Sequence, residues 1–397
     1  SNVSVKIRIF PYWKCLMMSI PVASVLLPAW KLLPMSSWKE EKKIAPPLSA
    51  GRGQAMGKQM NNSCYLGIDV GSISTNCVVI TPEGEVLCEI YKRGDGHPIE
   101  SVQQCLAQLT AQLPDRFCIR GVCTTGSGRI LAGAVVGADV IKNEISAHAR
   151  ATLHLYPEVR TIFEIGGQDS KVTIVRDGAV VDFSMNLVCA AGTGSFLDSQ
   201  ARRLNITIEE LSARAMMSEN PTNIAGRCTV FAESDMIHKQ QVGHEQKDIT
   251  MGLCHALVRN YLSNVCNGKE IKPPIVFQGG VSANKGIHRA FKEALRCDII
   301  IPPYNMVMGA YGAAIIASTS GIEKTKFRGK EASTKPIITQ GFECGDCPNC
   351  CEIIEVLDAA EVIGRTGGRC GKWEGKTGPR ESLRGTGPRC HVSGPST

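Results

Sequence analysis

Two short stretches of this chain carry acidic, glycine and hydroxyl residues in the same order. They are Tyr65-Leu-Gly-Ile-Asp-Val-Gly-Ser-Ile-Ser-Thr75 and Ile162-Phe-Glu-Ile-Gly-Gly-Gln-Asp-Ser-Lys171. Glycine lets backbone N–H groups approach an anion closely, and serine or threonine adds donors without bulk. Asp69 and Asp169 stand where a carboxylate can hold a magnesium ion through water. The two stretches therefore predict a clamp that holds ATP with Mg²⁺.

The elements that position these residues also occur twice. In each half an apolar strand runs into the glycine turn, resumes as a second strand, turns again and continues as a third. The later strands are expected over residues 76–80 and 86–91 in the first half, and over 172–175 and 179–186 in the second. Helices are then expected over Ile99–Leu113, Asn143–Leu155, Ile249–Cys266, Asn284–Leu295 and Gly309–Ser318, and strands over Cys118–Thr124, Ile275–Gln278 and Ile299–Ile301. The sequence thus predicts an α/β protein with two similar lobes around a nucleotide cleft.

Four parts are expected along the chain. Residues 1–62 are interpreted as a disordered or artefactual N-terminal extension, residues 63–150 as the first lobe and residues 151–320 as the second lobe. Residues 321–397 form a segment rich in cysteine, glycine and proline. The apolar run 15–30 is interrupted by two prolines and is too short to span a bilayer comfortably, so no membrane attachment is expected.

The composition argues against two classes of protein. The formal net charge is +7, but residues 1–62 hold nine basic and two acidic residues, whereas residues 63–320 hold 23 basic and 25 acidic ones. A folded part with this balance gives no support for nucleic-acid binding. The 18 cysteines do not fit a secreted disulfide scaffold, which would be short and rich in loops. Reduced thiols in the cytoplasm, some of them metal ligands, fit the pattern better.

Six segments, taken in order, closely resemble one family. They are Gly67-Ile-Asp-Val-Gly-Ser-Ile-Ser-Thr75, Asn143-Glu-Ile-Ser-Ala-His148, Gly166-Gly-Gln-Asp-Ser-Lys171, Cys189-Ala-Ala-Gly-Thr-Gly194, Cys228-Thr-Val-Phe-Ala-Glu-Ser234 and Gly279-Gly-Val-Ser-Ala-Asn284. Residues 64–320 thereby resemble the activator components of 2-hydroxyacyl-CoA dehydratases and the related ATPase subunits of benzoyl-CoA reductases, the BadF/BadG/BcrA/BcrD type. The resemblance implies the duplicated, ribonuclease H-like two-lobed fold of acetate kinase, sugar kinases, Hsp70 and actin.

The residues and the resemblance together give the expected site. Catalysis is expected from Asp69, Asp169 and Gln168, with both aspartates at Mg²⁺, and nucleotide binding from Gly71, Ser72, Ser74, Thr75, Gly166, Gly167, Ser170, Gly279, Gly280, Val281 and Asn284. The glycine pair follows a buried strand and would let the planar adenosine approach the backbone. Glu164 is either a neighbour of the magnesium ion or a strand-end carboxylate. His148 is interpreted as a hydrogen-bonded helix histidine.

The resemblance further implies one [4Fe–4S] cluster between two subunits, held by two cysteines from each. The matching positions here are Cys189 and Cys228. Cys189 stands directly before a glycine-rich helix start, where free N–H groups and the helix dipole favour a thiolate. Two cysteines cannot complete a four-thiolate site, so a homodimer follows if both are ligands. Glu233 and Asp235 either face solvent or tune the cluster region.

A second group of cysteines follows the lobes, in the run Cys344-Gly-Asp-Cys347-Pro-Asn-Cys350-Cys351 and at Cys370. Cys344, Cys347, Cys350 and Cys370 have metal-ligand spacing and are the candidate ligands of a second metal. The alternative is an unstructured cysteine-rich tail. The segment resembles the stretch that follows the activator domain in longer fused activase proteins, and we interpret residues 321–397 as a truncated module of that kind.

The expected function is ATP-driven transfer of a low-potential electron from ferredoxin or flavodoxin to an acyl-CoA dehydratase or reductase partner. ATP binding between the lobes would change the angle between the subunits. One rival is a small-molecule kinase of the same fold with Asp169 as base, which leaves Cys189 and Cys228 without a role. Another is a binding protein of the Hsp70 or actin type, which needs a peptide-binding domain or filament contacts. Because the expected ATP and shared-cluster residues lie within 64–320, that span is expected to be sufficient.

Overall fold

The computed structural model describes residues 62–94, 96–186, 192–226, 228–374 and 377–379. The expected N-terminal extension therefore lies, except for its last residue, outside the described residues, and so do Cys189 and residues 380–397. No helix within the described ranges combines the length and the apolar character that a bilayer crossing requires.

The first lobe is built on a mixed five-stranded sheet. Its strands are β1 (Ser63–Val70), β2 (Ser74–Ile80), β3 (Val86–Arg93), β4 (Cys118–Thr125) and β5 (Val140–Ile141), in the order β3-β2-β1-β4-β5. β1 is antiparallel to β2, which follows it after a tight turn, and parallel to β4, which follows helix α1 (Pro98–Gln112). α1 buries Val102, Leu106 and Leu109 at helical spacing, in the same core as helix α2 (Arg129–Val136).

The second lobe repeats this arrangement. Its strands are β6 (Thr161–Ile165), β7 (Ser170–Arg176), β8 (Ala179–Asn186), β9 (Ile275–Gln278) and β10 (Ile299–Ile300), in the order β10-β9-β6-β7-β8. β6 is antiparallel to β7 and parallel to β9, as β1 is to β2 and β4. The duplicated α/β architecture expected from the two glycine turns is therefore confirmed.

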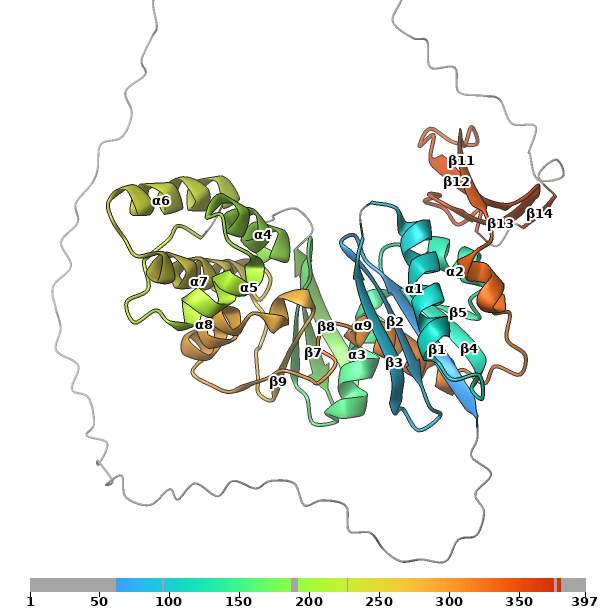
Figure 1. Ribbon diagram of the computed structural model, residues 1–397, viewed down its shortest axis with the longest axis horizontal. Helices are drawn as coiled ribbons and strands as arrows, with labels where there is room; N and C mark the ends of the chain where they lie inside the picture. Colours follow the sequence, from blue (N-terminus) through green and yellow to red (C-terminus); the bar gives the residue numbers. More distant parts are fainter. Residues whose placement is uncertain (1–61, 95, 187–191, 227, 375–376, 380–397) are drawn as a thin grey trace, which may run out of the picture. The chain divides into compact units, whose positions relative to one another are not determined.

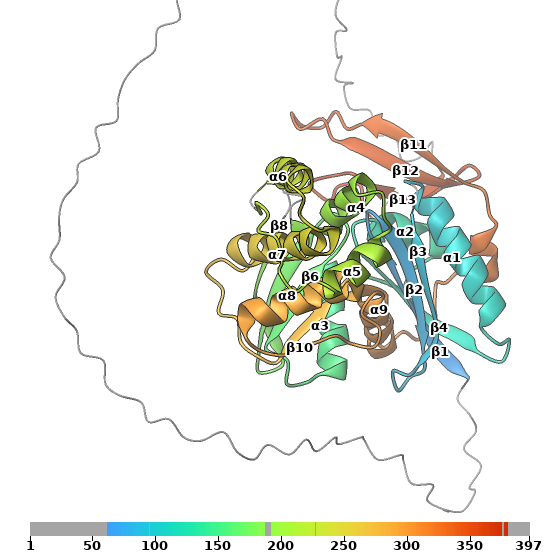
Figure 2. The same cartoon turned by 60° about the vertical axis from the view of Figure 1, so that its left-hand side comes forward.

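Helices follow the strands of the second lobe. They are α4 (Gly194–Arg203), α5 (Ile208–Met216), α6 (Thr229–Gln241), α7 (Gln246–Asn264) and α8 (Lys285–Leu295). Figure 1 and Figure 2 both show α5, α7 and α8 together beside the second sheet. Tyr261 of α7 and Phe291 of α8 pack on Phe163 of β6 and Phe277 of β9, with ring centroids 5.1 to 5.5 Å apart. This aromatic core holds β6 and β9, which lead into the second glycine turn and into Gly279.

Two helices join the lobes. α3 (Glu144–Leu155) packs against α9 (Met308–Thr319), and α9 also lies along β1. The approach is close because the contact residues are small: a Cβ at Gly67 would overlap Ala310 O, and one at Gly312 would overlap Ala147 O. α9 thus packs on the first sheet, although it falls within the residues expected for the second lobe. The chain returns to the first lobe after β10, so the lobes differ there from the expected linear division.

A third sheet follows α9 and the short 3-10 helix η3 (Gly329–Ser333). It is antiparallel, with strands β11 (Ile337–Glu343), β12 (Glu352–Asp358), β13 (Glu361–Thr366) and β14 (Gly378–Pro379) in chain order. Ala332 and Val356 are buried in the same core as α1 and α2. The packed core of the first lobe therefore extends past residue 320, beyond the span expected to be sufficient. This sheet is not predicted from the sequence, because β11 is largely exposed and lacks a regular apolar alternation.

Candidate functional site

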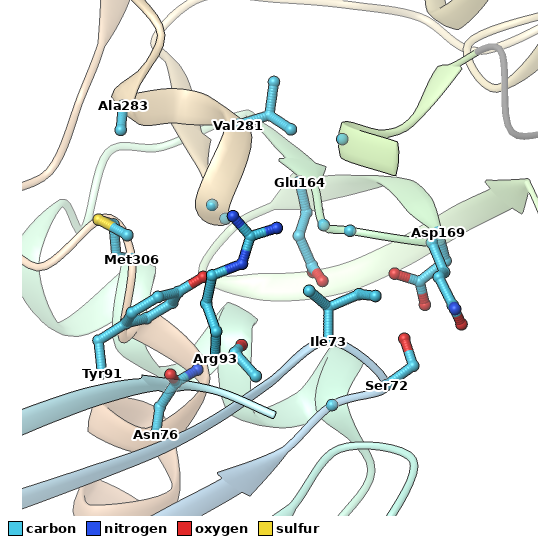
Figure 3. Close-up of a pocket in the computed structure, with 18 of the residues that line it drawn as sticks. Ser72, Ile73, Asn76, Tyr91, Arg93, Glu164, Asp169, Val281, Ala283 and Met306 are labelled. Atoms are coloured by element: carbon cyan, nitrogen blue, oxygen red, sulfur yellow. The ribbon is translucent and has the colours of Figure 1, made fainter. Parts of the chain in front are cut away.

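A cleft of about 510 Å³ lies between the turns of the two lobes. The predicted site residues that line it are Asp69, Gly71, Ser72, Ser74, Gly166, Gly167, Gln168, Asp169, Gly279, Gly280, Val281 and Asn284. Thr75 and Ser170 are instead buried within β2 and β7, behind the cleft surface. Figure 3 shows Ser72 and Asp169 near one another at one side of the cleft, and Met306 at the opposite side. The structure thus brings together residues from three distant parts of the chain.

Asp69 lines the cleft at the end of β1. A Cβ at Gly126 would overlap Asp69 Oδ1, and Gly126 has a φ of +87°, so glycine is required beside this carboxylate. Burial raises the pKa of Asp69 to about 6; His148 and Lys171 lower it, and Glu164 raises it. A divalent cation bound here would reverse the shift, because positive charge favours the ionised carboxylate.

Lys171 on β7 is a buried cation of the cleft, only 2% exposed. Its Nζ lies 2.8 Å from Asp169 Oδ2 and 3.1 Å from Glu164 Oε1. Burial lowers the pKa of Lys171, but the two carboxylates outweigh burial and raise it above its usual value. Lys171 therefore stays charged and holds both carboxylates in place. The sequence analysis gave Lys171 no role; the available signal was its position two residues after Asp169, on the same face of an extended chain.

His148 on α3 contacts two strands of the second sheet, through Glu164 on β6 and Gln278 on β9. Its Nε2 lies 3.4 Å from Glu164 Oε1, and its Nδ1 lies 3.0 Å from Gln278 Nε2. Thr152 Oγ1 in turn donates to Gln278 Oε1 at 2.9 Å. His148 is thus hydrogen-bonded, as expected for a helix histidine, and it also lines the cleft. Glu164 lines the cleft beside Lys171, and its role as a neighbour of a magnesium ion stays a prediction.

The second glycine turn is fixed by the start of α4. Gly194 N–H donates to Gly166 O at 2.9 Å, and Ser195 donates to Gly167 O from its N–H at 2.8 Å and from its Oγ at 2.6 Å. Within the turn, Gly166 N–H donates to Asp169 O at 2.9 Å. Since the carbonyl groups of the turn bond back into the protein, its shape is set before any ligand binds.

The third segment of the cleft follows β9. Gly279 N–H donates to Asn305 O at 2.9 Å, and the 3-10 helix η2 (Gly280–Ala283) leads to Asn284. Asn284 Oδ1 accepts the N–H of Ile287 at 3.1 Å and so begins α8. Its Nδ2 is buried and has no hydrogen-bond partner among the described residues. A ligand acceptor in the cleft would satisfy this donor.

Three further residues line the cleft from the first sheet, and the sequence analysis missed them. Strand pairing sets Asn76 opposite Asp69 and Tyr91 opposite Asn76, and Figure 3 shows Asn76, Tyr91 and Arg93 in the cleft. Asn76 Oδ1 is buried without a partner in the part of the chain that the structure describes. Arg93 Nη2 lies 2.7 Å from Asp198 Oδ2 on α4, so this ion pair crosses between the lobes. The positions of Asn76, Tyr91 and Arg93 in the cleft depend on the pairing register of the strands, which no single stretch of sequence reveals.

Of the predicted cluster cysteines, the structure describes Cys228. It is the residue directly before α6 and is half-buried. Val230 and Phe231, in the first turn of α6, are 67% and 68% exposed. Cys189 lies outside the described residues.

The predicted second metal group lies at the third sheet. Cys344 is buried, Cys350 is half-buried, and Cys347 and Cys370 are exposed. Within the described ranges, no three His, Cys, Asp or Glu side chains are gathered as ligands of a single metal ion.

Comparisons with known proteins all point to one family. The sequence profile of the BadF/BadG/BcrA/BcrD ATPase family matches residues 66–317. The 2-hydroxyisocaproyl-CoA dehydratase activator of Clostridioides difficile is 34% identical over 265 residues, which cover 66% of this chain and 97% of the relative. The (R)-2-hydroxyglutaryl-CoA dehydratase activating ATPase of Acidaminococcus fermentans is 34% identical over 255 residues, which cover 64% and 96%.

A solved structure extends the likeness to three dimensions. The activator of the 2-hydroxyisocaproyl-CoA dehydratase from Clostridium difficile with bound ADPNP matches this chain with a TM-score of 0.60 at 33% identity. The match covers 65% of this chain and 95% of that one. It confirms the two-lobed, ribonuclease H-like fold that the sequence predicted.

Proposed function

Because the chain belongs to the BadF/BadG/BcrA/BcrD ATPase family, we propose that it is an ATP-hydrolysing activator that passes a low-potential electron to an acyl-CoA dehydratase-type partner. One observation carries the proposal: two glycine turns related by duplication face one cleft, which also holds Asp69, Asp169 and Lys171. The two 34% identical relatives are named for dehydratases, which favours a dehydratase partner over a benzoyl-CoA reductase complex.

In this proposal the two turns cradle the phosphates of ATP, and Asp69 and Asp169 hold Mg²⁺ through water. Mg²⁺ supplies positive charge where negative charge develops on the phosphate oxygens. Gln168 and Asp169 orient the attacking water, whose oxygen bonds to the γ-phosphorus as the bond to ADP breaks. Lys171 keeps Asp169 in position for this role through their 2.8 Å contact.

The adenosine is proposed to lie against the segment after β9. Gly279 and Gly280 leave backbone uncovered at the cleft, and Val281 offers an apolar contact. The unpartnered Nδ2 of Asn284 is a donor that a ring nitrogen or a ribose oxygen would accept. These contacts would place the triphosphate toward the two glycine turns.

Cys189 and Cys228 are proposed to bind one [4Fe–4S] cluster shared by two copies of the chain. A buried side chain links the segments that carry them: Asn260 Nδ2 donates to Gly226 O at 2.9 Å, two residues before Cys228. A Cβ at Gly192, three residues after Cys189, would lie 2.9 Å from Asn260 Oδ1. Asn260 therefore supports the assignment of both thiols to one site.

The surroundings of Cys228 fit a shared cluster. The N-terminal end of α6 follows the thiol, and its partial positive charge favours a thiolate. The exposed Val230 and Phe231 beside it would be covered by a second copy, which makes a homodimer the proposed assembly. When bound, the cluster supplies one-electron chemistry, with ferredoxin or flavodoxin as the proposed donor. No disulfide joins the described cysteines, which suits a reducing cytoplasm.

The test uses the full chain purified without oxygen. We expect a dimer that contains iron and acid-labile sulfide, releases phosphate from ATP, and loses iron but not nucleotide binding in the variant C228S. Release of free phosphate separates this activity from a small-molecule kinase, which would place the phosphate on an acceptor. A colourless monomer that phosphorylates a sugar or an organic acid would refute the proposal.

A further inference from the structure

The third sheet carries reactive side chains that the nucleotide cleft does not include. Its interior holds an ion pair between Arg365 Nη2 and Glu355 Oε1 at 2.7 Å, with side-chain exposures of 1% and 3%. Beside it, the ring of Trp373 packs edge-on against Phe342 with centroids 5.0 Å apart. A buried charge pair and a packed indole require a defined fold. The cysteines of this segment are therefore held by tertiary structure.

Strand register brings two cysteine-bearing loops to the same end of the third sheet. The end of β11 pairs with the start of β12, Glu343 with Glu352, and the start of β12 pairs with the end of β13, Ile354 with Thr366. The loop between β11 and β12 contains four cysteines, and the segment after β13 contains Cys370. Both the loop and the segment leave the sheet at the same end of its strands.

Side-chain contacts tie the two loops together. Trp373 Nε1 donates to Cys344 Sγ at 3.3 Å, and the Lys372 ammonium pairs with Asp346. Trp373 and Lys372 belong to the segment that contains Cys370. Cys344 and Asp346 belong to the loop between β11 and β12. Cys370, two residues before Lys372, is thus held next to that loop although it follows Cys351 by 19 positions.

The spacing inside the loop indicates the class of ligand. Cys344, Cys347 and Cys350 follow one another at intervals of three residues, and Cys344 N–H donates to Cys351 O at 2.8 Å to close the loop. A C-x2-C-x2-C run with a distant fourth cysteine is typical of [4Fe–4S] proteins. Each thiolate of such a cluster binds a different iron, so the thiols stand farther apart than the ligands of one ion.

We propose that Cys344, Cys347, Cys350 and Cys370 bind a [4Fe–4S] cluster within each chain. Its four ligands come from one copy, so it is distinct from the proposed cluster shared between subunits. Cys351 is left out of the proposed ligand set, because the three-residue spacing runs through Cys344, Cys347 and Cys350. The Trp373 N–H that reaches Cys344 Sγ is the kind of hydrogen bond that tunes the potential of a cluster.

The test measures iron and acid-labile sulfide in the full chain purified without oxygen. One cluster per chain plus half of a shared cluster gives about six iron atoms per chain. The variants C347S and C370S should each lose about four of them and keep phosphate release from ATP, which also shows that the chain still folds. C351S, a cysteine of the same loop, and C118S, an exposed cysteine of β4, are the controls and should keep all of the iron.

The iron content of different variants distinguishes the two proposed clusters. C228S should lose about two iron atoms per chain, so an unchanged C228S counts against the shared cluster and leaves the third-sheet site standing. Full iron content in both C347S and C370S would overturn the third-sheet site. Zinc without sulfide at these cysteines would overturn it as well, since four thiolates around a single zinc ion are a different site.

Discussion

Lys171 Nζ and Asp169 Oδ2 lie 2.8 Å apart, at the point where the second glycine turn passes into β7. The same ammonium lies 3.1 Å from Glu164 Oε1 on the neighbouring strand β6. The buried Lys171 thus connects Asp169, a predicted catalytic residue, to Glu164, for which the sequence left two alternative roles open. The arrangement couples the stability of the lobe to the geometry of the cleft, because both acids lose their ammonium partner if the lysine is removed.

The variant K171M should destabilise the chain by about 2–4 kcal/mol, because it leaves Glu164 buried with a charge that has lost its strongest partner. Urea unfolding at pH 7.5 measures this. The double variant K171M/E164Q should recover a large part of the loss, since it removes the uncompensated charge as well. K292M, at an exposed ion pair with Asp298, is the control and should leave the unfolding midpoint unchanged. Equal stability of K171M and the parent chain would contradict the role given to Lys171.

Replacing Asp169 with Asn should lower kcat for ATP hydrolysis by about 10²–10³-fold while the Kd for ATP changes little. The charge on the carboxylate matters most where charge develops on the phosphate, which is in the transition state. Phosphate release and calorimetric binding give the two quantities. D177N, in the exposed turn at the other end of β7, is the matched control and should be as active as the parent. A D169N chain with ordinary kcat would move the catalytic role to another residue.

Protonation of Asp69 should lower the rate of ATP hydrolysis at acid pH. The pKa of Asp69 is raised to about 6 by burial, and only the ionised form holds Mg²⁺, so kcat/KM should fall as the pH drops below about 6. A raised carboxyl pKa also means that the folded chain loses stability as the pH rises from about 4, the usual pKa of Asp, to about 6, and that this loss persists at higher pH. D69N should therefore be more stable at pH 7.5, by about 3 kcal/mol, and nearly inactive. A D69N chain that is both less stable and fully active would contradict both parts.

The parts of the site that were predictable from sequence are those encoded locally. Asp69 and Asp169 each lie at the end of an apolar strand beside glycines, so the turn and its chemistry are visible in ten consecutive residues. Asn76, Tyr91 and Arg93 were not predictable in this way. They face the cleft because β1, β2 and β3 pair in one particular register, and a shift by one residue would turn them to the other face.

The same contrast holds for the fold. The duplicated hairpins predict both lobes. The packing of α9 on the first sheet depends on a close backbone approach at Gly67, and the local sequence does not predict such a long-range contact. The third sheet was missed because its core is small and its stabilising pairs, such as Arg365 with Glu355, join charged residues that read as surface positions. The sequence already groups Cys370 with the earlier cysteines, and the strand order supplies the structural basis for that grouping.

The ion pair between Arg93 and Asp198 should influence nucleotide affinity in two opposite directions. Both side chains line the cleft, so R93Q removes a positive charge from the site and should raise the Kd for ATP by about 5–20-fold. D198N removes a negative charge and frees the guanidinium, and should lower the Kd by a few-fold. Calorimetry at low and high salt measures both, and the differences should shrink with salt. R176Q, at an ion pair with Glu270 outside the cleft, is the control; parallel shifts in R93Q and D198N would contradict the electrostatic explanation.

Asn260 should control the shared cluster without touching the nucleotide. Its amide contacts the segments that lead to both predicted cysteines, through Gly226 O and beside Gly192. N260A removes these contacts, so the two segments lose their common support and the iron assigned to Cys228 should fall by more than half. ATP binding should persist, because Asn260 does not line the cleft. N264A, one turn further along α7 and exposed, is the matched control and should keep its iron. Iron analysis with calorimetry of ATP binding gives both readouts; a full iron content in N260A would show that the two cysteine segments are positioned independently of this side chain.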